Sequence, residues 1–434
     1  MTDDSLFPRR LTRGTRKGDV RAFRPGRGPG APRLSVLAPL LGAALSVVPA
    51  VSAEAAGDAT PTPVASASAG PELRLIPPSL DPASGACTKA SPTQVAATPW
   101  AQLSLNLAQA GRYTQGGGVL VAVVDTGVAP QAAGLAGRVR ADGAAAQDCV
   151  GHGTFLAGVI AGSPVPGSGF VGVAPRARIV AERGTDQWGR PSADMVADGI
   201  EAGIAAGAKV VDVSAALPAN TARLRAAIKH AAAADVLVVA PAAPDTAPQT
   251  GSGQSSAPPP ASYWPAASDG VLSVVDVDIN GQRPDGIPQP EHADLAAPGD
   301  GITGIGPKGT GNYVASGASV ASAFVAGTAA LVRAHLPHLT AAQTAARLKA
   351  TAAHAEVPLL DPSGALSTVL PTGAAPSSEP DAALHLPEAA PTSGVVPRAW
   401  ALAGACLLLG VLAAGAMAVA RVRLSRRTAG QRRA

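Results

Sequence analysis

The sequence of 434 residues is poor in aromatic side chains, which make up only 3% of it. Its hydrophobic residues, 47% of the chain, are mostly Ala, Val and Leu, and it holds 49 Gly and 41 Pro. Because this bias runs through the whole chain, a run of Ala does not by itself predict a helix. Helices and strands must be assigned from the spacing of apolar residues instead.

The middle of the chain lacks the basic face that binds nucleic acid. The formal charge is +4, but basic residues crowd the two ends, in RRLTRGTRK (9–17) and RVRLSRRTAGQRR (421–433). Nucleic-acid binding needs such a face within a folded domain, so we expect no nucleic-acid partner. The sequence also lacks internal repeats and the clustered carboxylates of calcium loops, and it implies no metal or organic cofactor.

Charge is absent from two apolar segments, of which Leu34–Ala53 is the first. It follows an Arg-rich lead and ends in small residues, as in a secretory signal peptide cleaved after Ala53 or Ala55. An uncleaved amphitropic helix is the alternative, but Pro39 and Pro49 count against it.

The second uncharged segment, Trp400–Ala420, has the length needed to cross a bilayer. Four arginines follow it between Arg421 and Arg427. The positive-inside rule places that tail in the cytoplasm and everything before Trp400 outside. A buried soluble helix is the alternative, but it leaves the arginines unexplained. We therefore predict a single-pass protein of the cell membrane with an extracytoplasmic body.

Cysteine is scarce, with three residues in all. Cys406 lies inside the predicted membrane span. Cys87 and Cys149 remain in the exported part, where oxidation is the default, and we predict that they form a disulfide. Closing a loop of that size would stabilise the fold by roughly 4 kcal/mol in the chain-entropy model.

From Val119 to about Ala353, short β-branched runs alternate with Ala-rich stretches of helical spacing. Strands are expected at 119–128, 177–183, 208–217, 235–240 and 270–278, and helices at 194–207, 221–234 and 319–336. The strands are continuously apolar, which indicates a parallel sheet covered on both faces by helices.

The remaining stretches differ in composition. Residues 99–112 have helical spacing, and residues 246–262 form a long, polar, Pro-rich loop, which we expect to be a mobile surface insertion. The boundaries that we predict are a basic lead and signal peptide (1–53), a disordered segment (54–75), an N-terminal extension (76–118), a catalytic domain (119–370), a linker (371–397), a transmembrane helix (398–420) and a basic tail (421–434).

Three short stretches carry the chemistry. Asp125 ends an apolar strand in VAVVDTGV, His152 precedes an apolar helix in GHGTFLAGVIAG, and Ser319 begins a helix in SGASVASAFVAG. Each has an ordinary alternative: the Asp as a turn residue, the His as a loop residue and the Ser as a helix cap. Together they form a chemical set, because a serine nucleophile needs a base, and that base needs a carboxylate.

Strand ends and helix starts meet at one edge of an open parallel sheet, so we expect these three side chains to converge there. A helix N-terminus would also offer backbone N–H groups to an oxyanion beside Ser319. The order Asp, His, Ser is one of the known arrangements of this triad.

In this order and spacing, DTG, GHGT and SG-x-S-x-A resemble the motifs of subtilisin-like serine proteases, and GVAPRARIV and DLAAPGDGI match that family too. DCVGHGT, SYWPAASDGVLSVVDVDINGQ, PWAQLSLNLAQ, the Cys87 region and the two membrane segments narrow the resemblance to the mycosins. These are membrane-anchored subtilases associated with type VII secretion in actinobacteria. The resemblance covers about residues 75–425.

The resemblance implies a subtilisin-like three-layer α/β/α fold with a mostly parallel sheet, and a peptide or protein substrate. It implies that Asp125, His152 and Ser319 are catalytic, and that an extension tied by Cys87–Cys149 wraps the protease. A type VII secretion membrane complex is the implied partner.

One expected residue is missing. In subtilases the strand corresponding to DVLVVAPAAPD (235–245) ends in AAAGN, whose asparagine donates the second oxyanion hydrogen bond. Alignment places Pro244 there, which has no donor. A shift of one residue would place Asp245 there instead, which helps only when protonated. The side chain of Asn312 or a backbone N–H near Ala243 could replace the donor, whose loss costs about 10²–10³ in rate.

Other positions around the site also differ from the residues usual in the family. Ala318 and Ala323 stand where the family has Thr and Pro, and Asp212 replaces a common Asn. The small residues Ser214, Ala215 and Ala216 are expected to bind an extended peptide through their backbone. Two hypotheses follow: a slow or narrowly specific endopeptidase, which the intact triad favours, or a catalytically silent partner of a secretion complex, which the missing asparagine favours.

Overall fold

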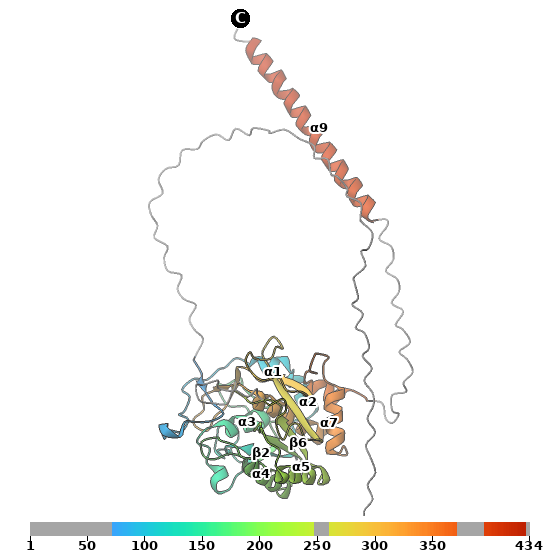
Figure 1. The fold of residues 1–434 in the computed structure, drawn as a ribbon. Coiled ribbons are helices and arrows are strands. Elements are labelled where there is room, and N and C mark those ends of the chain that lie inside the picture. The colour runs from blue at the N-terminus through green and yellow to red at the C-terminus, as the bar shows by residue number, and fades with distance from the viewer. Residues whose placement is uncertain (1–71, 247–259, 371–394, 431–434) are drawn as a thin grey trace, which may run out of the picture. The chain divides into compact units, whose positions relative to one another are not determined.

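The computed structural model describes residues 72–246, 260–370 and 395–430 (Figure 1). The expected signal segment, most of the expected Pro-rich loop and most of the expected linker lie outside these residues.

The main sheet has seven strands, all parallel, in the order β3-β4-β2-β5-β6-β7-β8. The strands are β2 (Leu120–Asp125), β3 (Val139–Arg140), β4 (Arg178–Arg183), β5 (Val210–Val213), β6 (Leu237–Pro241), β7 (Val271–Val277) and β8 (Leu295–Pro298). Five of them lie at the predicted places, and the predicted parallel sheet is confirmed. The short strands β3 and β8 were not predicted.

Helices cover both faces of this sheet, which gives the subtilisin-like α/β/α fold. Val121 and Val123 of β2 point into the core under α3 (His152–Ala161) and α6 (Ala318–His335). The residues between and after them, Ala122 and Val124, point into the core under α4 (Ala193–Ala205) and α5 (Ala222–Ala233). The period-2 alternation of a strand therefore fills two cores at once.

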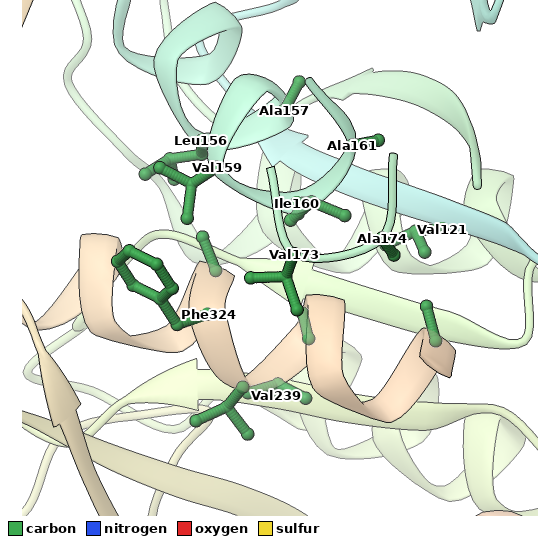
Figure 2. Packing of buried hydrophobic residues seen from close by; sticks show 14 of the residues in the cluster. Val121, Leu156, Ala157, Val159, Ile160, Ala161, Val173, Ala174, Val239 and Phe324 are labelled. Carbon is green, nitrogen blue, oxygen red and sulfur yellow. The ribbon is translucent and has the colours of Figure 1, made fainter. Parts of the chain in front are cut away.

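The core between α3 and α6 is built mostly from aliphatic side chains, with buried rings that include Phe155 of α3 and Phe324 of α6. Figure 2 shows Val159 of α3 close to Phe324, and Ile160 of α3 close to Val173, with Val121 and Val239 contributed by strands. Phe324 is only 2% exposed. This packing fixes the starts of α3 and α6 relative to the ends of the strands, and those starts carry His152 and Ser319.

The helices on the other face and at the C-terminal side begin at polar caps. Thr221 caps α5 by accepting from the N–H of Leu224, and Ser192 caps α4 in the same way. Thr340 and Gln343 form a capping box at the start of α7 (Ala341–Ala350). Such caps satisfy N–H groups that have no partner within the helix. A short helix, α8 (Pro362–Ser367), follows α7.

A second, smaller sheet joins the N-terminal part of the described chain to the catalytic domain. Its strand β1 (Arg74–Leu75) pairs parallel with β10 (Tyr313–Ala315), which pairs antiparallel with β9 (Ile302–Gly304). The predicted disordered segment extended to residue 75, and this boundary is wrong because β1 already has a partner strand.

The helical spacing of 99–112 produces two helices, α1 (Trp100–Ser104) and α2 (Leu107–Tyr113). They are separated at Asn106, whose φ of 47° is left-handed and cannot continue a helix.

The last helix, α9 (Val395–Gly430), contains the segment Trp400–Arg421, whose mean hydropathy is 2.3. It is long and apolar enough to cross a membrane. The helix extends beyond both ends of the predicted span (398–420), into the predicted linker and basic tail.

Candidate active site

Three polar side chains meet at the carboxyl edge of the main sheet. Asp125 is the last residue of β2, His152 is the first residue of α3 and Ser319 is the second residue of α6. The Nδ1 atom of His152 lies 2.6 Å from Oδ2 of Asp125, and its Nε2 atom lies 3.1 Å from Oγ of Ser319. All three residues are buried. This is the geometry by which a carboxylate orients an imidazole toward a nucleophile.

A second carboxylate, that of Asp148, holds the loop before His152 in place. One of its oxygens accepts from the hydroxyl of Thr126 (2.9 Å) and the N–H of Gly151 (2.7 Å). The other accepts from the N–H (2.8 Å) and the hydroxyl (2.6 Å) of Thr154. Burial raises the pKa of Asp148, while these hydrogen bonds lower it. The sequence analysis missed this residue, although an acidic residue shortly before a helix start is a capping signal.

Two glycines bring the loop after Asp125 against the start of α3. Gly127 has a φ of +99°, and a Cβ at Gly153 would overlap with the carbonyl oxygen of Gly127. A side chain at Gly153 would therefore push His152 away from Asp125. The glycines of the DTG and GHGT motifs thus have a steric role that their catalytic neighbours do not explain.

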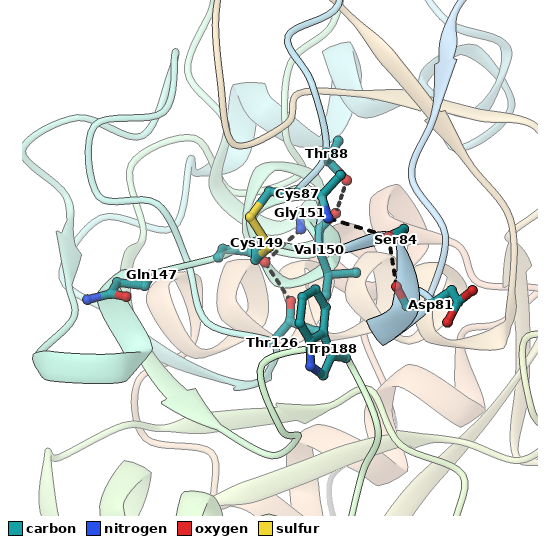
Figure 3. The surroundings of a disulfide bond; sticks show 12 residues. Asp81, Ser84, Cys87, Thr88, Thr126, Gln147, Cys149, Val150, Gly151 and Trp188 are labelled. Atoms are coloured by element: carbon teal, nitrogen blue, oxygen red, sulfur yellow. Dashed lines mark hydrogen bonds between the residues drawn. A yellow bond between two sulfur atoms is a disulfide. The ribbon is translucent and has the colours of Figure 1, made fainter.

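The predicted disulfide between Cys87 and Cys149 is present, and it joins the N-terminal extension to the loop before His152 (Figure 3). Beside it, the N–H of Thr88 donates to the carbonyl of Cys149 (2.9 Å), and the Thr88 hydroxyl donates to the carbonyl of Val150 (2.5 Å). The extension is thus bound to the catalytic loop by one covalent bond and two hydrogen bonds.

Asp245, and not Pro244, lies beside the nucleophile. Its Oδ1 accepts from the N–H of Ser319 (2.9 Å), and its Oδ2 accepts from the Ser319 hydroxyl (2.7 Å). Its Oδ2 is also 3.6 Å from Nε2 of His152. This favours the alternative alignment, in which Asp245 and not Pro244 stands at the position of the oxyanion asparagine.

The side-chain amide of Asn312, suggested as a substitute oxyanion donor, makes its hydrogen bonds to other groups. Its amide nitrogen donates to the hydroxyl of Ser168 (2.9 Å) and the carbonyl of Gly304 (3.3 Å), and its oxygen accepts from the N–H of Val95 (2.8 Å). It fastens the extension to the domain. The other suggestion, a backbone N–H near Ala243, lies in a buried segment just before Asp245.

Asp212 of β5 lies under the start of α6 and is fully buried. Its Oδ1 is 2.8 Å from the hydroxyl oxygen of Ser322, which is itself 2.8 Å from the carbonyl oxygen of Ser319. Burial is the main cause that raises the pKa of Asp212, to about 8. A protonated Asp212 would donate to Ser322, which could then donate its single proton to Ser319.

The imidazole of His152 lies between two carboxylates. Burial alone would lower its pKa, but the neighbouring charges of Asp125 and Asp245 raise it well above the usual value. The protonated form of His152 is therefore favoured in this arrangement.

The predicted substrate-binding residues directly follow β5. Ser214 and Ala215 are buried, and Ser214 donates through its N–H to the carbonyl of Val124 (3.3 Å). Ala216 is half-buried, and the next residue, Leu217, pairs with Trp264 through two backbone hydrogen bonds. Of the three predicted residues, Ala216 is the most accessible to a peptide.

The described residues contain no group of three or more His, Cys, Asp or Glu side chains arranged to bind a metal ion.

Comparison with known proteins places this geometry in a family. Residues 116–378 match the subtilase family, peptidase S8. Mycosin-1 of Mycobacterium tuberculosis is 32% identical in an alignment of length 388 that covers 76% of this chain and 86% of that protein.

Two solved structures are similar as well. The serine protease MycP1, described as an essential component of the type VII (ESX-1) secretion system, matches with a TM-score of 0.55 and 30% identity, over 65% of this chain and 92% of that one. A chain of the periplasmic assembly from the ESX-5 inner membrane complex matches with a TM-score of 0.57 and 27% identity, over 70% and 94%. Because the family match spans more than half of the sequence, the chain belongs to the subtilase family, and within that family it is mycosin-like.

Proposed function

We propose that the chain is an exported, membrane-anchored serine endopeptidase of narrow specificity. The observation that carries this proposal is the buried hydrogen-bonded series Asp125–His152–Ser319, with distances of 2.6 and 3.1 Å. A fold alone does not imply an activity, but a nucleophile, a base and an orienting carboxylate within hydrogen-bond distance support acyl transfer.

The roles of the three residues follow from their positions. Ser319 Oγ attacks the carbonyl carbon of the peptide bond and passes its proton to Nε2 of His152. Asp125 accepts from Nδ1–H and stabilises the imidazolium that forms. His152 then protonates the leaving amine, the C–N bond breaks, and water hydrolyses the acyl-enzyme by the same steps in reverse order.

Stabilisation of the oxyanion would come from the start of α6. The N–H of Ser319 points to the place where the oxyanion forms, and the positive end of an 18-residue helix supports it. Asp245 stands where subtilases have an amide donor, so we expect a rate about 10²–10³ lower than that of a site with two donors.

Substrate would bind along Ser214–Ala216 as an extended strand. Small side chains there leave room for the side chains of the peptide, and pairing through the backbone does not depend on sequence. Selectivity would then come from the neighbouring loops.

We further propose that α9 anchors the protein in the cell membrane, with the catalytic domain outside the cytoplasm. The arginines after Trp400–Arg421 support this orientation. The similarity to MycP1 and to a chain of the ESX-5 complex supports a type VII secretion complex as the partner.

One observation favours a second candidate, a catalytically silent partner within such a complex. The carboxylate of Asp245 occupies both the N–H and the hydroxyl of Ser319. If it never leaves, the serine cannot react, and the geometry of the three residues would serve the fold alone.

Labelling with a fluorophosphonate probe distinguishes the two. The full-length chain in detergent would be compared with Ser319→Ala, with both checked for folding by circular dichroism. We expect labelling of the wild-type chain that is lost in the variant. A folded wild-type chain that is not labelled from pH 4 to pH 10 would contradict the enzyme and support the silent partner.

A further inference from the structure

Asp245 and His152 are both within hydrogen-bond distance of the Ser319 hydroxyl, and Oδ2 of Asp245 lies 3.6 Å from Nε2 of His152. Oδ2 of Asp245 is 2.7 Å from Oγ, and Nε2 of His152 is 3.1 Å from it. The side chain of Asp245 is 7% exposed and that of His152 is 4% exposed. Ser319 Oγ therefore hydrogen-bonds to two side chains that are almost inaccessible to water.

The carboxylate also fills the place of a reacting carbonyl oxygen. Oδ1 accepts from the N–H of Ser319 at 2.9 Å, which is the bond that an oxyanion would make. A Cβ at Gly317 would overlap with the Asp245 carboxylate, so a glycine at this position makes the close approach possible. In this arrangement Oδ1 of Asp245 accepts the hydrogen bond that the oxyanion would accept during the reaction.

The Ser319 hydroxyl carries one proton, so the hydrogen bonds that link His152, Ser319 and Asp245 can be donated in two directions. In one, His152 Nε2–H donates to Ser319 Oγ, whose proton is donated to an ionised Asp245. In the other, a protonated Asp245 donates to Ser319 Oγ, whose proton is donated to a neutral His152. The two forms hold the same number of protons and differ only in which residue, His152 or Asp245, carries the shared one.

Only the second direction is reactive. In the first direction, Ser319 faces a protonated imidazole that cannot accept its proton, and the oxyanion would meet a carboxylate. In the second direction the base is free and the carboxyl group is a donor.

We infer that Asp245 is a catalytic residue that shares one proton with His152 across the nucleophile, and that peptide cleavage proceeds from the form in which Asp245 holds this proton and donates the second oxyanion hydrogen bond. This inference rests on the proposed endopeptidase function, and it identifies Asp245 as the second oxyanion donor that the site otherwise lacks.

In the reactive form, the atoms and protons balance through formation of the acyl-enzyme. The substrate carbonyl oxygen displaces Oδ1 from the N–H of Ser319, and the protonated carboxyl turns toward that oxygen. Oγ bonds to carbon, the Oγ proton goes to His152, and the π electron pair of the carbonyl moves to the oxygen. When the C–N bond breaks, the proton leaves His152 for the amine. Asp245 keeps its own proton throughout.

The groups around the pair are Asp125 of β2, which contacts His152, and Asp212 of β5 and Asp276 of β7, whose pKa values are raised mainly by burial and also by the charge of Asp245. Arg283 lies beside Asp276, with 3.4 Å between their nearest charged atoms. Burial lowers the pKa of His152, but the charges of Asp125 and Asp245 and their hydrogen bonds to the imidazole raise it well above its usual value. This direction favours retention of the shared proton by the pair.

This arrangement predicts a bell-shaped dependence of rate on pH. At low pH both residues are protonated and the base is lost. At high pH the shared proton is lost, and the ionised Asp245 repels the oxyanion. The alkaline limb lies above the usual pKa of histidine because the pKa of His152 is raised.

The test is Asp245→Asn, which provides an amide donor that does not titrate. Fluorophosphonate labelling and hydrolysis of a peptide library by the full-length chain would be measured from pH 4 to pH 10. We expect the variant to lose the alkaline limb and to exceed the wild-type rate there by at least about tenfold, toward the 10²–10³ that a second donor contributes. Asp300→Asn, which removes a negative charge from the same edge, should keep the bell shape.

Three results would overturn the inference. An Asp245→Asn chain that is slower than the wild type at every pH would show that Asp245 acts as a base. A variant that keeps the alkaline limb would assign that limb to another group. In both cases labelling of the wild-type serine still supports the endopeptidase. If neither chain is labelled while both are folded, the proposed function fails together with the inference.

Discussion

At the scale of single residues, Asp148 shows how much of the catalytic geometry depends on a group that never meets the substrate. Its carboxylate accepts four hydrogen bonds from Thr126, Gly151 and Thr154. In Asp148→Asn the amide would face some of these donors with its own N–H groups. We expect a loss of about 2–4 kcal/mol in the free energy of unfolding, from hydrogen bonds to a buried charge.

The same change should slow labelling of Ser319 by up to about 10²-fold, because small displacements of a base are costly. Thermal melting and labelling rates would measure both effects. The matched control is Asp142→Asn, whose carboxyl is exposed and does not cap the following turn. Equal effects of the two variants would contradict the role given to Asp148.

The buried carboxyl of Asp212 leads to a prediction about the dependence of stability on pH. Its pKa rises from the usual 3.8 to about 8 in the folded chain, mainly because of burial. Between these values the folded chain keeps a proton that the unfolded chain has released, so stability falls as the pH rises from about 4 to about 8. Asp212→Asn has no such proton. We expect the variant to gain in melting temperature over the wild type as the pH rises through this window.

Melting of both chains at intervals from pH 4 to pH 9 would measure this difference. Ser322→Ala is the control, because it removes the hydrogen bond that lowers the pKa of Asp212 and should keep the slope. A difference between wild type and Asp212→Asn that stays constant over the whole range would show that Asp212 is ionised in the folded chain.

The sequence predicted these residues unequally, for physical reasons. Asp125, His152 and Ser319 stand in short motifs whose glycines limit the backbone, so their meeting could be expected. Asp245 follows two prolines in a loop, where a register is not determined by any periodicity and a shift of one residue changes the chemistry. Asp148 could not be recognised as an anchor because its four partners are known only from the folded loop.

At the scale of elements, the clearest prediction concerns the extension. Cys87 and Cys149 are 62 residues apart in sequence, and closing such a loop contributes roughly 4 kcal/mol in the chain-entropy model. We expect Cys87→Ser/Cys149→Ser to lose stability by up to that amount in denaturant unfolding. Reductant should destabilise the wild type and leave the double variant unchanged. Cys406→Ser, which keeps the bridge, should behave as the wild type.

The helices and strands that the sequence predicted are those with a strong local pattern. The β-branched runs of β2, β5 and β6 and the Ala-rich spacing of α4 and α5 predicted those elements. Strand β8 reads LAAP and carries too little β-branched character to be recognised. The residues 74–75 were placed in a disordered segment because their strand exists only through a distant partner, β10.

At the scale of the whole molecule, the prediction is about topology. In a Cys406→Ser background, Ser367→Cys lies on the exposed end of α8, and Ser425→Cys lies beyond the apolar segment Trp400–Arg421. We expect a membrane-impermeant maleimide to label residue 367 on intact cells, and residue 425 only after the membrane is opened. Labelling of both on intact cells would contradict a cytoplasmic tail.

Two features of the sequence predict the organisation of the whole molecule. Long apolar segments and arginine clusters can be recognised from composition, because a bilayer sets their length and charge pattern. The alternation of strands and helices predicted a parallel sheet covered on both faces, and the motifs around Asp125, His152 and Ser319, through their resemblance to subtilases, predicted that this domain is catalytic.

The disulfide beside His152 bears on when the loop that carries the base becomes covalently fastened to the extension. A reducing compartment keeps Cys87 and Cys149 as thiols, so the covalent part of this attachment is missing there. Under the topology proposed above, the bridge forms only after the chain has crossed the membrane, and the covalent attachment of the catalytic loop then follows export.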